Sequence, residues 1–302
     1  MRRGGGSCFC GDRCRCRAGA SGEACHYRYC ARRAGYTEHG RRPHLLHAYA
    51  WLECGGLAGV PDGVRFYGDP RQTVEVHPAK TASEPVLENV AFATADVAAL
   101  RLYLKSKGVA VPSGLTKLRD GEQTFRVKDP EGNAIEFVQR AAEGSATTGK
   151  APESISGRII HAGFIVHSAA AEDHFYKDVL GFHNYWSGGM KEGATDWVSL
   201  QVPDGTDWVE YMLNIPPDPS HRQIGVQDHF SLGVVDMDTA VTKLKERGWT
   251  PSASSKKQMG RDGKFQLNLY DPDEVRVEFM EFKPKQEPCC HPITGAQPGA
   301  DR

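Results

Sequence analysis

The chain of 302 residues lacks cysteine over most of its length and has no long apolar segment. All nine cysteines lie before Gly55 or after Pro288, so no disulfide framework threads the segment between these residues. No apolar run approaches the roughly 20 residues that span a bilayer, and the first residues lack the apolar middle of a signal peptide. A formal net charge of -1 gives no reason to expect nucleic acid as a partner. We therefore expect a cytoplasmic protein with no nucleic-acid or membrane partner.

Lysine is absent before Lys80, although arginine is frequent in the same stretch. Residues 1–58 are rich in Gly, Arg, Cys and His and show no sustained period of 2 or 3.6, which predicts a low-complexity or disordered segment. Two hypotheses account for this composition: a genuine extension, or a shifted reading frame in a GC-rich gene. The cysteines from Cys8 to Cys30 lack the pair-of-pairs spacing of a zinc site, so we do not expect one there.

Residues 59–143 show the periodicity of a small α+β module. Alternating residues at 64–67 and 72–76 predict a hairpin, and further strands are predicted at 90–93, 109–111, 125–127 and 134–138. Between them, residues 97–105 carry apolar side chains at helical spacing, with Asp96 as the expected N-cap and Gly108 as the terminating glycine. The Gly/Ser/Thr/Pro-rich residues 144–157 are predicted to be a linker.

Residues 158–284 repeat the same order of strand, helix and strands twice. The predicted helices are 169–180, closed by Gly181, and 237–247, closed by Gly248. Strands are predicted at 159–166, near 182–186, and at 197–202, 208–213, 230–235, 266–269 and 275–279. Residues 285–302 are rich in Pro, Gly and Cys and are predicted to form a flexible tail. At roughly 100 to 200 residues per domain, the length also favours two domains.

The repeated unit places equivalent residues at a fixed separation. His161 and Glu210 are 210 − 161 = 49 residues apart, and His229 and Glu278 are 278 − 229 = 49 apart. In the preceding unit Asn89 stands where a histidine would, 136 − 89 = 47 residues before Glu136. A still earlier unit keeps its last strand, which ends in Glu75, but its first strand and helix, expected near His26, are not recognisable.

Paired βαβββ units with His on the first strand and Glu on the last resemble the vicinal oxygen chelate superfamily, which includes glyoxalase I and extradiol dioxygenases. The resemblance is carried by the strand His161–Val166, the run Phe175–Phe182 and the Asp-Pro turns that begin at Asp129 and Asp271. It covers about residues 64–282. It implies an α+β fold in which tandem βαβββ repeats form cups of curved mixed sheet, with helices packed outside.

The resemblance also implies a divalent metal ion, Zn, Ni, Mn or Fe, bound by His161, Glu210, His229 and Glu278 in module 158–284. Such an ion chelates two adjacent oxygens of a small-molecule substrate, and Glu210 or Glu278 would also move the proton. The module 59–143 is expected to be incomplete and metal-free. A homodimer is possible, although two tandem units can also close the cup within one chain.

Three functions fit this pattern. Glu210 on the fourth-ligand strand favours a glyoxalase I-like lyase or isomerase. An Fe(II)-dependent extradiol-type dioxygenase would use His161, His229 and Glu278 only. A non-catalytic binding or resistance protein would need no metal.

Each site residue also has a plainer explanation. The histidines could be strand residues whose hydrogen bonds are made within the protein. Glu210 could face solvent, and Glu281 could be the ligand in place of Glu278. Two further sets are expected to be structural: surface histidines, at His167, His174, His183 and His221, and core tryptophans, at Trp186, Trp197 and Trp208.

Overall fold

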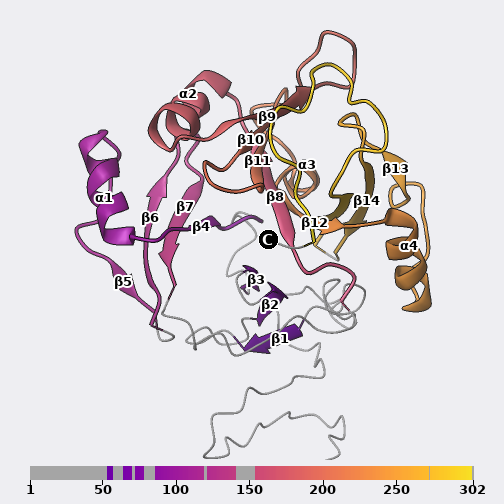
Figure 1. Ribbon diagram of the computed structural model, residues 1–302, viewed down its shortest axis with the longest axis horizontal. Helices are drawn as coiled ribbons and strands as arrows, with labels where there is room; N and C mark the ends of the chain where they lie inside the picture. Colours follow the sequence, from indigo (N-terminus) through magenta and orange to yellow (C-terminus); the bar gives the residue numbers. More distant parts are fainter. Residues whose placement is uncertain are drawn as a thin grey trace, which may run out of the picture.

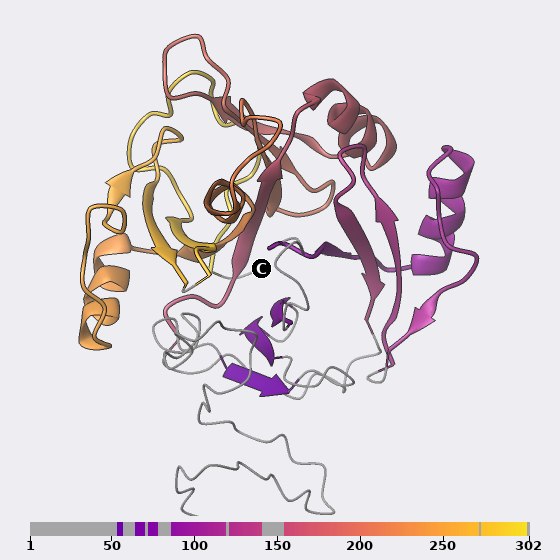
Figure 2. The same ribbon diagram turned by 180° about the vertical axis from the view of Figure 1, so that it is seen from behind.

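The computed structural model describes residues 53–56, 64–69, 72–77, 86–118, 121–140, 154–271 and 273–300. The Cys8–Cys30 segment and the region around His26 lie outside these residues. So does most of the predicted 144–157 linker. Figures 1 and 2 show three sheets, with α1 and α4 at opposite outer ends of the molecule.

The N-terminal part contains two small sheets. The first has the order β1 (Glu53–Gly56), β2 (Val64–Asp69), β3 (Gln72–Val76), so the predicted hairpin is present. The second has the order β4 (Val90–Ala93), β7 (Ala134–Gln139), β6 (Gln123–Lys128), β5 (Thr116–Lys117), with helix α1 (Val97–Ser106). This second sheet is one βαβββ unit.

The C-terminal part is one eight-stranded sheet built from two further units. Its order is β13 (Gln258–Met259), β14 (Phe265–Tyr270), β15 (Arg276–Glu281), β12 (His229–Val234), β8 (Ile159–Ile165), β11 (Trp208–Met212), β10 (Trp197–Gln201), β9 (His183–Gly188). The first strands of the units, β8 and β12, pair antiparallel, and each last strand runs parallel to its own first strand. The predicted α+β fold of tandem βαβββ repeats is confirmed, and both halves of this sheet come from one chain.

The helices begin and end where local chemistry predicts. Asp96 accepts a hydrogen bond from Ala99 N at 2.8 Å at the start of α1, and Asp236 does the same for Thr239 N at 2.7 Å at the start of α4 (Met237–Glu246). The predicted helix 169–180 is α2 (Ala169–Asp173) continued by a π-helical turn, η2 (His174–Val179). Gly248, with φ +88°, follows α4 as the predicted terminator.

Three local predictions are wrong. Residues 109–111 form no strand, and the strand of that region is the short β5 further on. Helix α3 (His221–Gln227) was not predicted because it is short and follows a Pro-rich stretch; its signal is the capping box between Ser220 and Gln223. Strand β1 lies inside residues 1–58, which were predicted to be disordered. Its sequence has no strand periodicity, and the strand forms by pairing with β2.

The core is divided into three clusters of buried apolar side chains. One lies under α4 and includes Leu244, Leu267 and Phe279. A second is shared by the N-terminal unit and the first C-terminal unit, where Phe137 of β7 belongs to the same cluster as Tyr176 of η2. The third contains Tyr185, Trp186, Trp208, Met280 and Phe282, so Trp186 and Trp208 are core residues as predicted.

The N-terminal unit contacts the C-terminal sheet through the turn at Glu131. The Glu131 carboxylate accepts hydrogen bonds from His167 N at 2.9 Å and Ser168 N at 2.6 Å, at the start of α2. In return, Glu131 N donates to the buried Glu172 at 2.9 Å. The N-cap residue Ser168 makes no side-chain capping bond, so a carboxylate from another unit satisfies this helix terminus.

The C-terminal segment is not a flexible tail, and that prediction is wrong for residues 285–300, here called the strap. Lys285 N donates to Gly263 O at 2.7 Å and Cys289 N to Arg261 O at 2.8 Å, beside β14. Thr294 N donates to Tyr185 O of β9 at 2.9 Å. The strap therefore links the two ends of the eight-stranded sheet. The proline and glycine content predicts irregular backbone. Irregular backbone can nevertheless form hydrogen bonds with the unpaired N–H and C=O groups at the edges of a sheet.

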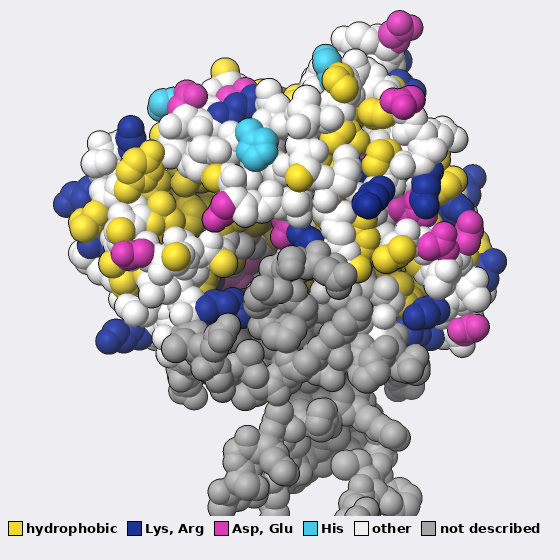
Figure 3. Space-filling model, viewed as in Figure 1, with side chains coloured by type: hydrophobic (Ala, Val, Ile, Leu, Met, Phe, Trp, Pro, Cys, Tyr) yellow, Lys and Arg dark blue, Asp and Glu magenta, His cyan; other side chains and the backbone are white. Residues whose placement is uncertain are grey.

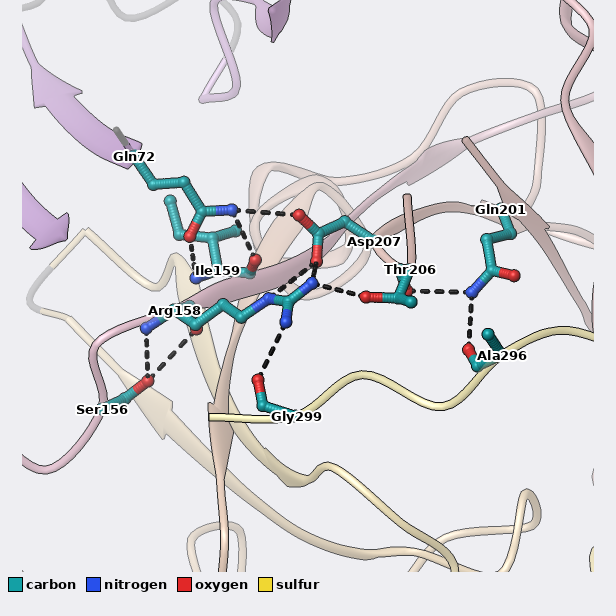
Figure 4. Close-up of polar contacts among 9 residues, drawn as sticks. All are labelled: Gln72, Ser156, Arg158, Ile159, Gln201, Thr206, Asp207, Ala296 and Gly299. Atoms are coloured by element: carbon teal, nitrogen blue, oxygen red, sulfur yellow. Dashed lines mark hydrogen bonds and ion pairs between the residues drawn. The ribbon is translucent and has the colours of Figure 1, made fainter. Parts of the chain in front are cut away.

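Arg158 fixes the far end of the strap at the base of β8 (Figure 4). Its guanidinium donates to Asp207 at 2.7 Å and to Gly299 O at 2.8 Å. Gln72 of β3 reaches the same place, donating to Ile159 O at 2.8 Å and accepting from Ile159 N at 2.7 Å. One polar cluster thus joins the N-terminal hairpin, strand β8 and the strap. Cys289 and Cys290 form a disulfide between adjacent residues, which ties no distant segments together.

Among the described residues, no helix has both the length and the apolarity that crossing a membrane requires. On the face drawn in Figure 3, basic and acidic side chains are interspersed, and hydrophobic side chains gather between α1 and α2. The described part of this face carries no extended patch of one charge.

The contact between the units predicts a pH-dependent stability. Burial, with the nearby Asp129, raises the pKa of Glu172 from 4.5 to about 8. The folded state therefore keeps a proton that the unfolded chain loses above 4.5, so the contribution of Glu172 to stability is present below pH 4.5 and is lost as the pH rises towards 8. We expect the gain in free energy of unfolding from Glu172→Gln to be about 3 kcal/mol larger at pH 8 than at pH 5.

Chemical denaturation at both pH values measures this difference. Glu192→Gln, at an exposed residue of the same charge, is the matched control and should show no pH-dependent gain. Equal effects of Glu172→Gln at pH 5 and pH 8 would contradict the prediction.

Candidate metal centre

Strand register brings the four predicted ligands to one face of the eight-stranded sheet. His161 of β8 lies opposite Ser231 of β12, and Ser231 lies opposite Glu278 of β15. In the next row His229 lies opposite Gly163, which lies opposite Glu210 of β11. Each row thus holds one histidine and one glutamate, on either side of a small residue.

The ligand atoms converge in space. His161 Nε2 lies 3.1 Å from His229 Nε2 and 3.1 Å from Glu278 Oε2. Glu210 Oε2 lies 4.0 Å from His161 Nε2 and 3.9 Å from His229 Nε2. The ligand atoms of His161, Glu210 and His229 all lie within 4.8 Å of one another. The structure therefore brings the four side chains together on the sheet, and their role as metal ligands stays a prediction.

Small residues in the middle of each row make this convergence possible. A Cβ at Gly163 would lie only 2.2 Å from Cε1 of His229, so the imidazole passes directly over the glycine backbone. Ser231, fully buried between His161 and Glu278 in its row, has a short side chain, and His161 Nε2 and Glu278 Oε2 meet across it at 3.1 Å. Neither residue is recognisable as part of a site from sequence, because only the register places it there.

Neighbouring groups orient both imidazoles. His229 Nδ1 lies 2.7 Å from Gln227 O, and a donor Nδ1–H makes Nε2 the nitrogen that carries the lone pair. The His161 ring lies beside the Trp208 ring, with centroids 4.8 Å apart. One terminal guanidinium nitrogen of Arg276 contacts the His229 ring, 2.7 Å from Nδ1 and 2.8 Å from Nε2.

The electrostatics favour the metal-binding protonation state of two of the four residues, His229 and Glu278. Burial, together with Arg276, lowers the pKa of His229 well below its usual value, so the imidazole is neutral. Burial alone would raise the pKa of Glu278, but the hydrogen bond with His161 and the charge of Arg276 lower it to about 2. Burial raises the pKa of Glu210. Two imidazoles and two carboxylates, buried and facing one another, fit a divalent ion.

The alternative residues lie elsewhere. Glu281 accepts a hydrogen bond from Met237 N at 2.8 Å and so satisfies the start of α4. Glu210 faces the other ligands and not bulk solvent, with 12% of its side chain exposed. The histidines predicted to lie at the surface are all exposed: His167, His174, His183 and His221.

The equivalent position of the N-terminal unit is filled by a closed hydrogen-bond network. Asn89 Nδ2 donates to Glu136 Oε2 at 3.1 Å, so these two residues face each other as the His–Glu pairs do. Thr124 donates to the other carboxylate oxygen at 2.5 Å, and Arg126 lies 3.0 Å from Oε2. Both oxygens of Glu136 are thus engaged within the unit, and Asn89 stands where the C-terminal units have a histidine.

Sequence reasoning missed three polar residues beside the group. Arg276 precedes Glu278 by two positions on β15, so strand alternation was a signal for it. Lys264 and Asp262 are almost fully buried, and nothing in their local sequence separates them from surface loop residues.

Comparison with known proteins agrees with this geometry. The family model described as the Glyoxalase/Bleomycin resistance protein/Dioxygenase superfamily matches residues 59–137 and 158–279. No curated protein matches the chain.

Solved structures share the fold at low identity. The Mn(II)-bound glyoxalase from Novosphingobium aromaticivorans is 20% identical, with a TM-score of 0.57 over 78% of this chain and 76% of that one. The 2,2',3-trihydroxybiphenyl 1,2-dioxygenase of Sphingomonas wittichii is 16% identical, with a TM-score of 0.56 over 78% and 84%. The homoprotocatechuate 2,3-dioxygenase of Brevibacterium fuscum is 16% identical, with a TM-score of 0.57 over 78% and 74%.

The close passage of His229 over Gly163 predicts a strong effect of one methyl group. Gly163→Ala should displace the imidazole and lower the affinity for Mn(II) at least about tenfold, because ligand orientation sets metal affinity. Titration with Mn(II), followed by calorimetry, measures the change. Gly114→Ala, where an added Cβ meets nothing within 4 Å, is the matched control. Unchanged Mn(II) affinity in Gly163→Ala would contradict the proposed position of the ligand.

Metal content gives a direct test of the group. Full-length protein purified without chelators should carry close to one equivalent of divalent metal by plasma mass spectrometry, and His229→Ala should lose it. His221→Ala replaces an exposed histidine and should keep it. Absence of metal from the wild-type protein would make the four residues a structural cluster.

Proposed function

Because the chain belongs to the glyoxalase/bleomycin resistance protein/dioxygenase superfamily, we propose that it is a metal-dependent lyase or isomerase of the glyoxalase I type. Its substrate is a small molecule with two adjacent oxygens. The observation that carries the proposal is the convergence of two histidines and two carboxylates, His161, His229, Glu210 and Glu278, on one buried face.

In this proposal His161 and His229 hold the ion through Nε2, and Glu278 holds it as the fully ionised carboxylate. The ion, Zn, Ni, Mn or Fe, supplies a Lewis acid for the two substrate oxygens. Burial of the group excludes water, which strengthens each electrostatic contact within it.

Glu210 is the residue best suited to move a proton. It has the most exposed side chain of the four, at 12%, and its Oε2 lies 4.0 Å from His161 Nε2, where that of Glu278 lies at 3.1 Å. Both carboxylates lie at nearly the same distance from His229 Nε2, 3.9 Å and 4.0 Å. Ser199 holds its other oxygen at 3.3 Å. A carboxylate in this position can take a proton from a carbon next to the chelated oxygens and return it to the neighbouring atom.

One observation favours a second function, an Fe(II)-dependent extradiol-type dioxygenase. His161, His229 and Glu278 converge without Glu210, with Glu278 Oε2 at 3.1 Å and 4.0 Å from the two imidazoles. These three residues alone make the two-histidine, one-carboxylate set that binds iron and leaves positions open. Glu210 would then be a neighbouring acid or base.

Glu210→Gln separates the two functions. The amide keeps the shape of the side chain but cannot accept a proton. In a glyoxalase-type reaction kcat should fall by about 100-fold or more, which is the usual contribution of a positioned base. In a dioxygenase the iron content should persist, and oxygen uptake with catechols should continue.

The measurements are isomerisation of hemithioacetals, followed by ultraviolet absorbance, and oxygen uptake at an electrode, with Zn, Ni, Mn and Fe supplied in turn. Glu192→Gln controls for loss of a surface charge. If neither the wild-type protein nor the variant holds a metal, but both bind a small molecule, the third alternative applies, a non-catalytic binding protein.

A further inference from the structure

A buried lysine lies beside the metal group and has no assigned role. Lys264 precedes β14, on the inner side of the sheet, and is fully buried. Its Nζ lies 4.6 Å from the centroid of the Trp208 ring, and Trp208 in turn contacts the ring of His161. The ammonium group is therefore separated from a predicted metal ligand by a single aromatic ring.

The hydrogen-bond capacity of this ammonium is only partly used. An ammonium has three donors. Among the residues that the structure describes, Lys264 Nζ has one oxygen partner, Tyr185 Oη at 2.8 Å, and it also lies 4.9 Å from the centroid of that ring. The Tyr185 hydroxyl donates in turn to Gln297 of the strap at 2.7 Å. The other close neighbours of Nζ among the described residues are the faces of the Tyr185 and Trp208 rings, so two of its three donors remain available to an oxygen atom of a bound molecule.

The carboxylates around Lys264 act on it from a distance. No carboxylate oxygen of the described residues lies within 4.0 Å of Nζ, so Lys264 is not held in a direct ion pair. Asp262, Glu210 and Glu278 act on it from a greater distance. Lys264 contacts Trp208, which strand alternation places on the same face of β11 as Glu210, so the ammonium lies on the face of the sheet that carries the four predicted ligands.

We infer that Lys264 binds a carboxylate of the substrate, so that the proposed enzyme acts on a small anionic molecule which carries a carboxylate besides its two chelating oxygens. This inference rests on the proposed function. Burial lowers the pKa of Lys264 to about 8, and the group is still mostly charged at neutral pH. A carboxylate matches its single charge, whereas a phosphate would need further cationic groups, such as those that phosphate sites usually provide.

Redox-inert chelators test the inference without requiring turnover. Acetohydroxamate offers two adjacent oxygens, and the monohydroxamates of malonate and succinate offer the same oxygens with an added carboxylate. For Mn(II)-loaded full-length protein, calorimetry should show that at least one carboxylated probe binds about tenfold or more tightly than acetohydroxamate. Lys264→Met, which keeps the length of the stem, should abolish that preference and leave the affinity for Mn(II) and for acetohydroxamate within about threefold.

Lys257→Met is the matched control. Lys257 also lies over an aromatic ring, that of Phe265 at 3.8 Å, but it is bonded to Asp238 of α4 on the opposite side of the sheet. This variant should keep the preference. Tyr185→Phe removes the one protein partner of Nζ and should lower the preference only a few-fold.

The outcomes separate this inference from the proposed function. Metal binding with equal affinity of wild-type protein for charged and uncharged probes would overturn the inference and leave the metal site standing, even if Lys264→Met does not fold. A preference that persists in Lys264→Met would also overturn it. Absence of Mn(II) binding would overturn both.

Discussion

The antiparallel pairing of β8 with β12 is the interaction on which the rest of the structure depends. It joins two βαβββ units into one sheet. It also pairs His161 with Ser231, which lies two residues after His229 on the neighbouring strand. Since each last strand runs parallel to its own first strand, the same pairing fixes Glu210 and Glu278 on the outer sides of the two histidines. A shift of one residue between β8 and β12 would turn one half of the group to the opposite face.

The two faces of this sheet have separate tasks. The outer face packs against helices and the N-terminal unit, in clusters that are almost wholly apolar. The inner face carries the ligands, Arg276 and Lys264 among the aromatic rings of Tyr185 and Trp208. Strand alternation lets one stretch of chain serve both tasks. Burial of charged groups costs free energy unless each charge has a partner. Here the buried acidic and basic side chains offset one another, and we propose that a bound cation and an anionic ligand complete the balance.

The strap and the N-terminal unit hold this arrangement from outside. The strap contacts both ends of the sheet and is fixed by Arg158, which also contacts Asp207 next to β11. The N-terminal unit keeps the general form of the repeat but uses Asn89, Thr124 and Arg126 to satisfy Glu136 internally. The βαβββ unit therefore carries a His–Glu pair in each half of the C-terminal sheet, and in the N-terminal unit it carries an Asn–Glu pair whose hydrogen bonds are made within the protein.

Sequence by itself determined the repeat, the helix caps and the four candidate ligands. These depend on local signals: the 3.6 and 2.0 periods, Asp96 and Asp236 as caps, and the equal spacing of His161 to Glu210 and His229 to Glu278. Tertiary structure alone decided which small residues let the ligands meet, that Glu281 belongs to a helix terminus, and that the C-terminal residues are a strap. It also revealed Lys264, whose burial depends on residues about 80 positions earlier in the chain and on the strap. Local sequence carries propensity and spacing, whereas pairing between distant strands depends on register, which no single segment encodes.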